Sequence, residues 1–76
     1  MVRLRAVLFK EEEANGIYRA HFIVNVGGAE VTRFALEFKR KPSKKTLAER
    51  VGRMLEEIAR NLPPLPERLV IEKDVG

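Results

Sequence analysis

Residues 17–26 read IYRAHFIVNV, and the dipeptide Gly27-Gly28 follows them. Every second residue of this stretch is apolar: Tyr18, Ala20, Phe22, Val24 and Val26. A period of two that is rich in aromatic and β-branched residues predicts a half-buried strand. Asn15-Gly16 before the stretch and Gly27-Gly28 after it are turn signals, because these residues tolerate a positive φ. Residues 17–26 therefore form the predicted middle strand of two successive hairpins.

The flanking stretches show the same period. Residues 2–10 and 30–39 alternate apolar with polar side chains, and residues 11–16 are interpreted as a polar loop. Three consecutive strands with short connections predict an antiparallel meander. A strict Gly27-Gly28 turn would place Phe34 opposite His21 and divide the apolar residues between two faces. We therefore expect an odd-length loop that pairs Ala20 with Phe34, or a bulge.

A helix is predicted from Ser43 to Asn61. Ser43 is a good N-cap, and the apolar residues after it recur with a period of 3.6. The proline-rich residues 63–66 end the helix, residues 67–73 alternate again as a short last strand, and residues 74–76 are expected to fray. Gly52 inside the helix indicates close approach of another element, since glycine disfavours helices.

The expected order is β-β-β-α-β, a single two-layer α+β domain over residues 1–76 with the helix packed on an antiparallel sheet. The core is predicted to consist of Phe22, Phe34, Leu36, Phe38, Leu47, Val51, Leu55, Ile58 and Ile71.

Size and composition favour an oligomer. A 76-residue chain buries a limited core, and without cysteine it forms no disulfide. Val7, Phe9 and Ile23 also lie off the predicted core face, so a homodimer is expected. The absence of a leader or membrane segment indicates a cytoplasmic protein with no membrane partner. A charged fraction of 34% without glutamine or cysteine is typical of thermophile proteins.

Catalytic signals are weak. The only serine, Ser43, is explained as a helix cap, and the only histidine, His21, has no carboxylate near it in the sequence. The acidic residues 11–13 are interpreted as a solvated run, and no glycine-rich phosphate loop precedes a helix. We expect no enzymatic activity, no cofactor and no metal site.

The basic residues indicate the function. Residues 1–45 hold ten Lys or Arg against five Glu. One group lies on the sheet face opposite the core, and a second group lies where the third strand leads into the helix. Such cations suit phosphates, and an aromatic ring among them suits stacking on bases. The sequence therefore predicts a nucleic-acid-binding protein with little sequence preference, whose contacts are Arg3, Arg5, Phe9, Arg19, His21, Arg33, Lys39, Arg40, Lys41, Lys44 and Lys45.

Two alternatives stay open at this stage. The pattern does not distinguish DNA from RNA or single strands from duplexes. The basic sheet face could also be a subunit interface of a homo-oligomeric adaptor protein without a nucleic-acid ligand, in which the arginines pair with Glu30 or Glu37 of a second chain.

Overall fold

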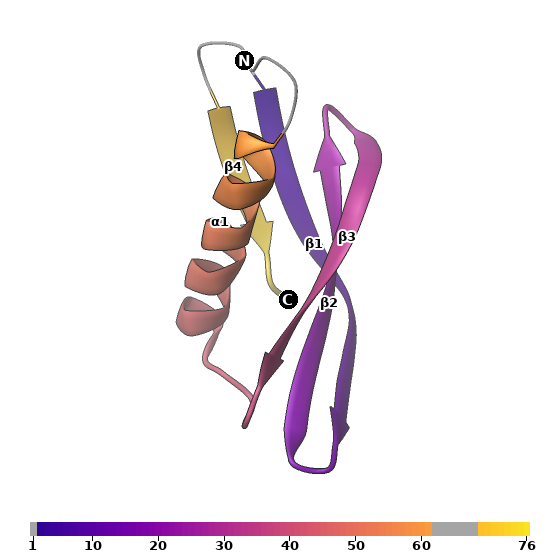
Figure 1. Ribbon diagram of the computed structural model, residues 1–76, viewed down its shortest axis with the longest axis vertical. Helices are drawn as coiled ribbons and strands as arrows, with labels where there is room; N and C mark the ends of the chain where they lie inside the picture. The colour runs from indigo at the N-terminus through magenta and orange to yellow at the C-terminus, as the bar shows by residue number, and fades with distance from the viewer. Residues whose placement is uncertain (1, 62–68) are drawn as a thin grey trace.

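The computed structural model describes residues 2–61 and 69–76 and contains one four-stranded sheet with one helix on one face (Figure 1). The elements are β1 (Val2–Ala14), β2 (Ile17–Val26), β3 (Ala29–Phe38), α1 (Lys44–Arg60) and β4 (Leu69–Asp74). The strand order is β3-β2-β1-β4, and β1–β2 and β2–β3 are antiparallel. The predicted α+β class, with a three-stranded meander, one helix and a short fourth strand, is confirmed.

The fourth strand runs parallel to β1, so the sheet is mixed rather than wholly antiparallel. The chain reaches this position through α1, and a helical crossover is the usual way to connect strands into a parallel pair. Asp74 pairs with Val7 in the ladder, so the expectation that it frays was wrong. The predicted proline-rich connector and the start of the predicted last strand, residues 67 and 68, lie outside the described residues.

The first hairpin is longer than predicted. Residues 11–14 continue β1 instead of forming a loop, and Ala14 lies opposite Ile17 across the two-residue turn Asn15-Gly16. Both turn residues have positive φ, as the sequence predicted. The register between the strands shifts at Phe9, which is an extra residue between Leu8 and Lys10. This bulge moves every later side chain of β1 to the opposite face of the sheet.

The second hairpin also contains a register shift. Gly27 and Gly28 form a two-residue turn with positive φ, and Val26 lies opposite Ala29. The shift lies between Val24 and Asn25 of β2 and leaves Val31 of β3 without a partner. It brings Phe22 opposite Phe34, so the expected bulge is present, whereas the expected pairing of Ala20 with Phe34 was wrong.

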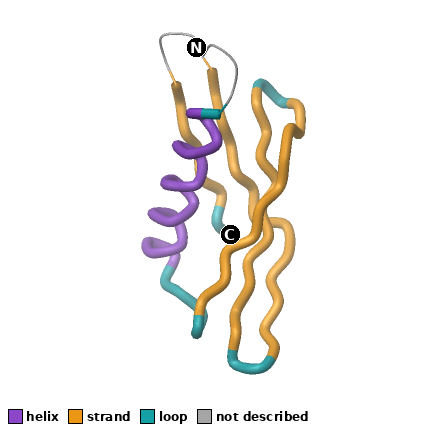
Figure 2. Tube along the Cα trace, viewed as in Figure 1, coloured by secondary structure: helices purple, strands orange, loops and turns teal. Residues whose placement is uncertain are grey.

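The helix begins and ends close to the predicted residues. Ser43 is its N-cap and accepts a hydrogen bond from the Thr46 amide at 3.2 Å, and Asn61 is the C-cap. Figures 1 and 2 show α1 beside β4, with β2 and β3 on the far side of β1. The expected close approach at Gly52 is made by a side chain: among the described residues, the three atoms nearest to a Cβ added there belong to the flexible Lys73 side chain.

The core lies between α1 and the sheet. Phe22, Leu36, Leu47, Val51 and Leu55 are buried as predicted, while the other four predicted core residues are half-buried and pack against them. The buried set also contains residues that the prediction omitted: Leu4, Ala6, Tyr18, Ala20, Val24 and Ala59. Arg19 and Arg33 are exposed on the opposite face of the sheet. This confirms the prediction that the face with Phe22 and Phe34 is the inward one.

Candidate nucleic-acid interface

The sheet face opposite α1, here called the open face, carries the first group of predicted contacts. Arg3 and Arg5 come from β1, Arg19 and His21 from β2, and Arg33 from β3. Phe9 lies among them and is 44% exposed. The Arg33 guanidinium is 5.2 Å from the centre of the Phe9 ring, and the His21 ring is 5.9 Å from it. The register therefore brings these side chains to one surface.

Carboxylates from the same strand or from a neighbouring strand accompany these cations. The ion pairs, with their N–O distances, are Arg3–Glu72 (3.1 Å), Arg5–Asp74 (3.2 Å), Lys10–Glu12 (2.7 Å), Arg19–Glu37 (2.9 Å), His21–Glu12 (3.3 Å) and Arg33–Glu30 (3.1 Å). The open face is therefore mixed in sign, and the premise that it is a basic face was wrong. Carboxylates next to the arginines repel phosphate, so this face is a weaker attractor than the sequence indicated.

Three of the five acidic partners come from two features that the sequence pattern did not predict. The bulge at Phe9 turns Glu12 onto the open face, where its carboxylate meets Lys10 and His21. Hydrogen bonds from Lys10 and then from His21 lower the pKa of Glu12 below its usual value. The parallel β4 contributes Glu72 and Asp74. Lys10 was not among the predicted contacts. Lys10 and Glu12 are two residues apart in one strand and so share a face, and a bulge before them would have placed both on the open face.

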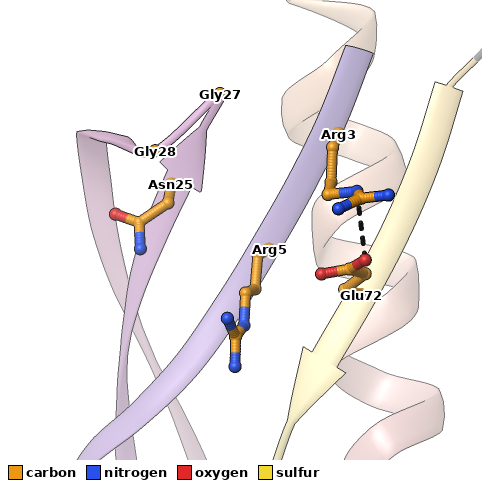
Figure 3. A pocket seen from close by; sticks show the side chains of 6 residues that line it. All are labelled: Arg3, Arg5, Asn25, Gly27, Gly28 and Glu72. Carbon is orange, nitrogen blue, oxygen red and sulfur yellow. Dashed lines mark ion pairs between the residues drawn. The ribbon is translucent and has the colours of Figure 1, made fainter. Parts of the chain in front are cut away.

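An open hollow of about 410 Å³ lies at one end of the open face (Figure 3). Arg3 and Arg5 of β1, Asn25 of β2, the Gly27-Gly28 turn and Glu72 of β4 line it. Figure 3 shows the Arg3–Glu72 ion pair inside this hollow. Arg5 is held by Asp74, so both guanidinium groups are already engaged with carboxylates.

The second group of predicted contacts has a different environment. The cationic junction comprises the exposed residues Lys39, Arg40, Lys41, Lys44 and Lys45, between the end of β3 and the first turn of α1. Among residues 2–61 and 69–76, no ion pair involves any of them. The first turn of α1 contains no acidic residue. These five cations therefore lie together without an ion pair to a carboxylate of the described part of the chain.

The helix N-terminus adds to the positive potential at the junction. Ser43 Oγ accepts from the Thr46 amide, while helix geometry leaves the amides of Lys44 and Lys45 without an intrahelical acceptor. Lys44 and Lys45 also lie at the positive end of the helix dipole, where cations are unfavourable. An anion bound at this position would relieve that repulsion and accept from the free amides.

A cavity of about 230 Å³ adjoins the junction, with Lys41 and Lys44 at its wall. Tyr18 and Glu11 also line it, and the Tyr18 hydroxyl donates a hydrogen bond to Glu11. Burial, followed by this bond to a carboxylate, raises the pKa of Tyr18 to about 12. Tyr18 is therefore a neutral donor at physiological pH, held toward Glu11 rather than offered to a ligand.

Two further properties concern the described residues. They contain no group of three or more His, Asp and Glu side chains arranged to hold a metal ion. They also contain no helix with the length and apolar character needed to cross a membrane. Comparison of the chain with models of protein families, with curated proteins and with solved structures found no match.

Proposed function

We propose that this protein binds nucleic acid electrostatically, with little sequence preference, and that the cationic junction supplies the main phosphate contacts. The observation that carries the proposal is the contrast between paired and unpaired cations. The arginines of the open face have carboxylate partners, whereas none of the described ion pairs involves the junction.

Charge distribution supports the same assignment. The whole chain has a net charge of +4, and the five junction cations supply +5, so the other residues together have a net charge of −1. The positive excess of the protein is therefore concentrated in one short segment. Concentrated charge attracts a polyanion more strongly than the same charge dispersed among carboxylates, because oppositely charged neighbours cancel its field.

The open face has a secondary role in this proposal. Its arginines keep further N–H donors for phosphate, but the carboxylate beside each of them repels the phosphate and offsets much of the gain. Phe9 can stack on an unpaired base through its exposed surface, while the Arg33 guanidinium lies over the ring, 5.2 Å from its centre. Binding through the junction with a stacking contribution from Phe9 would favour single strands over duplexes.

The proposal is tested by titrating labelled single-stranded and duplex oligonucleotides with the protein over a series of salt concentrations. Each phosphate contact contributes a slope of about 0.9 on duplex and about 0.7 on single strands in log affinity against log salt. The variant R40Q/K41Q/K44Q/K45Q should reduce this slope by up to about 3.6 on duplex if all four cations contact phosphates.

The matched control is R3Q/R5Q/R19Q/R33Q, which removes the same four charges from the open face. It should change the salt dependence much less than the junction variant does. Equal losses in the two variants would show that net charge, and not the junction, governs binding. If the unmodified protein binds no oligonucleotide even at low salt, the proposal is wrong and the alternative of a protein-interaction module without a nucleic-acid ligand is favoured.

A further inference from the structure

The outer edge of β3 is open to strand pairing over the regular part of the strand, from Thr32 to Phe38. β3 lies at one end of the strand order, and no other described strand pairs with its outer side. Natural proteins shorten such edges or protect them with proline or charges that point toward the core. β3 has ten residues and no proline, and its helix-side residues from Thr32 to Phe38 are uncharged. Its three charged residues, Glu30, Arg33 and Glu37, lie on the open face. The opposite edge strand, β4, has six residues and carries a charge on the helix side, since Lys73 lies against Gly52 of α1.

The helix-side surface along β3 is also incompletely covered. Phe34 and Phe38 are half-buried, and the backbone of α1 comes close to β1 and β4 rather than to β3. Phe34 stacks on Phe22, with 5.2 Å between the ring centres, and the Arg50 guanidinium lies 5.4 Å from the centre of the Phe38 ring. An apolar strip therefore reaches the sheet edge, where a neighbouring strand would bury it further.

We propose that β3 pairs antiparallel with β3 of a second copy of this chain, about a two-fold axis at Ala35, so that the two four-stranded sheets become one continuous sheet. This inference does not depend on nucleic-acid binding. Main-chain hydrogen bonds between the edges and burial of Phe34 and Phe38 provide the attraction, as in other complexes formed by strand addition.

Charge complementarity selects the register. With the axis at Ala35, Arg33 of each copy lies opposite Glu37 of the other, and Phe34 lies opposite Leu36. Moving the axis to Phe34 or Leu36 places Arg33 opposite Ala35 or Lys39, and an axis at Arg33 or Glu37 places like charges opposite each other. Among these five registers, only the axis at Ala35 sets opposite charges directly across from each other, which stabilises a strand pair.

The existing ion pairs fit this arrangement. Glu37 already contacts Arg19 at 2.9 Å, and Arg33 contacts Glu30 at 3.1 Å. Adding the Arg33–Glu37 contact between copies joins these pairs into a row of alternating charge across the dimer. Because the side chains are exposed, each pair adds little affinity, and their main effect is to disfavour other registers.

Association is measured first, by sedimentation and native mass spectrometry over the micromolar range without nucleic acid. The unmodified protein should form a dimer of two 8.7 kDa chains. R33E or E37R alone should weaken the dimer roughly tenfold or more, because each substitution sets like charges opposite each other twice. Mixing R33E with E37R should restore a heterodimer, since both cross-strand pairs are then complementary. R3E, which disrupts the distant Arg3–Glu72 pair, should leave the dimer intact.

The register is tested with single cysteines, which are unique because the chain has none. A35C should cross-link to its own copy under a short bifunctional maleimide, because residue 35 faces itself across the axis. V31C is the matched control at an exposed β3 position, and it faces Lys39 of the second copy in this register. A monomer at every concentration, no heterodimer in the R33E and E37R mixture, or equal cross-linking of V31C would each overturn the proposal.

Discussion

The Tyr18 hydroxyl donates a hydrogen bond to the Glu11 carboxylate, from β2 to β1, on the same side of the sheet as α1. The two residues share this side only because Phe9 is a bulge. In an uninterrupted strand, Glu11 would lie opposite Arg19 on the open face, but the shifted register places it opposite Ala20. One extra residue in β1 therefore exchanges the positions of two neighbouring carboxylates, turning Glu11 toward Tyr18 and Glu12 toward His21.

Tyr18 should titrate with a midpoint near pH 12 in the folded protein, because burial and then the Glu11 carboxylate disfavour the tyrosinate. The folded-state pKa lies above the ordinary tyrosine value of 10.0. The resulting stability is therefore fully present below about pH 10 and is lost as the pH rises through about 12. Tyrosinate absorbance reports this group alone, since the chain has one tyrosine and no tryptophan. E11Q should lower the midpoint only in part, and a midpoint near 10 in the folded unmodified protein would contradict the assignment.

Phe22→Ala should reduce the free energy of unfolding by about 3–5 kcal/mol, because Phe22 is fully buried and stacks on Phe34. The control is Phe9→Ala, which makes the same substitution at an exposed position. It should cost less than about 1 kcal/mol, since it removes mainly the Arg33 contact. Urea denaturation monitored by circular dichroism measures both values, and similar losses would contradict the assigned core.

Ser43→Ala should reduce stability by about 1 kcal/mol, because the Thr46 amide loses its acceptor at the start of α1. Ser43→Asn retains a side-chain oxygen and should be close to neutral. Neither variant alters the charge of the junction. Their effect on stability can therefore be measured separately from the effect of charge on nucleic-acid affinity. An unchanged stability in Ser43→Ala would show that the cap contributes nothing.

Gly52→Ala should increase stability by about 0.5–1 kcal/mol, because alanine favours the helix and the new Cβ would meet only the mobile Lys73 side chain at 3.4 Å. Gly28→Ala should have the opposite effect, since Gly28 has a φ of +89° in the second turn. Thermal unfolding of the two variants shows whether each substitution raises or lowers the stability. A destabilised Gly52→Ala would indicate a closer packing partner at that position.

Local signals in the sequence sufficed for most of the fold. Asn15-Gly16, Gly27-Gly28 and Ser43 each specify a turn or a cap through their own backbone preferences, so the positions of the two turns and of the helix start were predicted correctly. Phe22 and Phe34 must lie on one face of the second hairpin to be buried together. This predicted a register shift in the hairpin but not its position. The strand character of residues 11–14 was missed because glutamate has a low strand propensity, and here pairing with β2 overrides it.

The electrostatics of the candidate site was harder to predict. The cations of the open face were assigned correctly to one surface, because they follow the period of their own strands. Most of their partners lie on other strands. Glu72 and Asp74 reach Arg3 and Arg5 only through the parallel placement of β4, which no local signal indicates. The junction could be identified from the sequence because its residues are consecutive, and its charge does not depend on register.

The parallel pairing of β4 with β1 divides the formation of this sheet into early and late events. The two hairpins close over two-residue turns, whereas Val2 lies opposite Leu69, so this pair must close a loop of nearly the whole chain. Loop closure of that length is slow relative to hairpin formation. During synthesis, the N-terminal half of β1 therefore has one vacant edge until residues 69–74 leave the ribosome. Pulsed hydrogen exchange should show the amides of the β2 ladders protected before those of β4, and in that interval the nascent chain exposes two sheet edges, one on β3 and one on β1, to its neighbours.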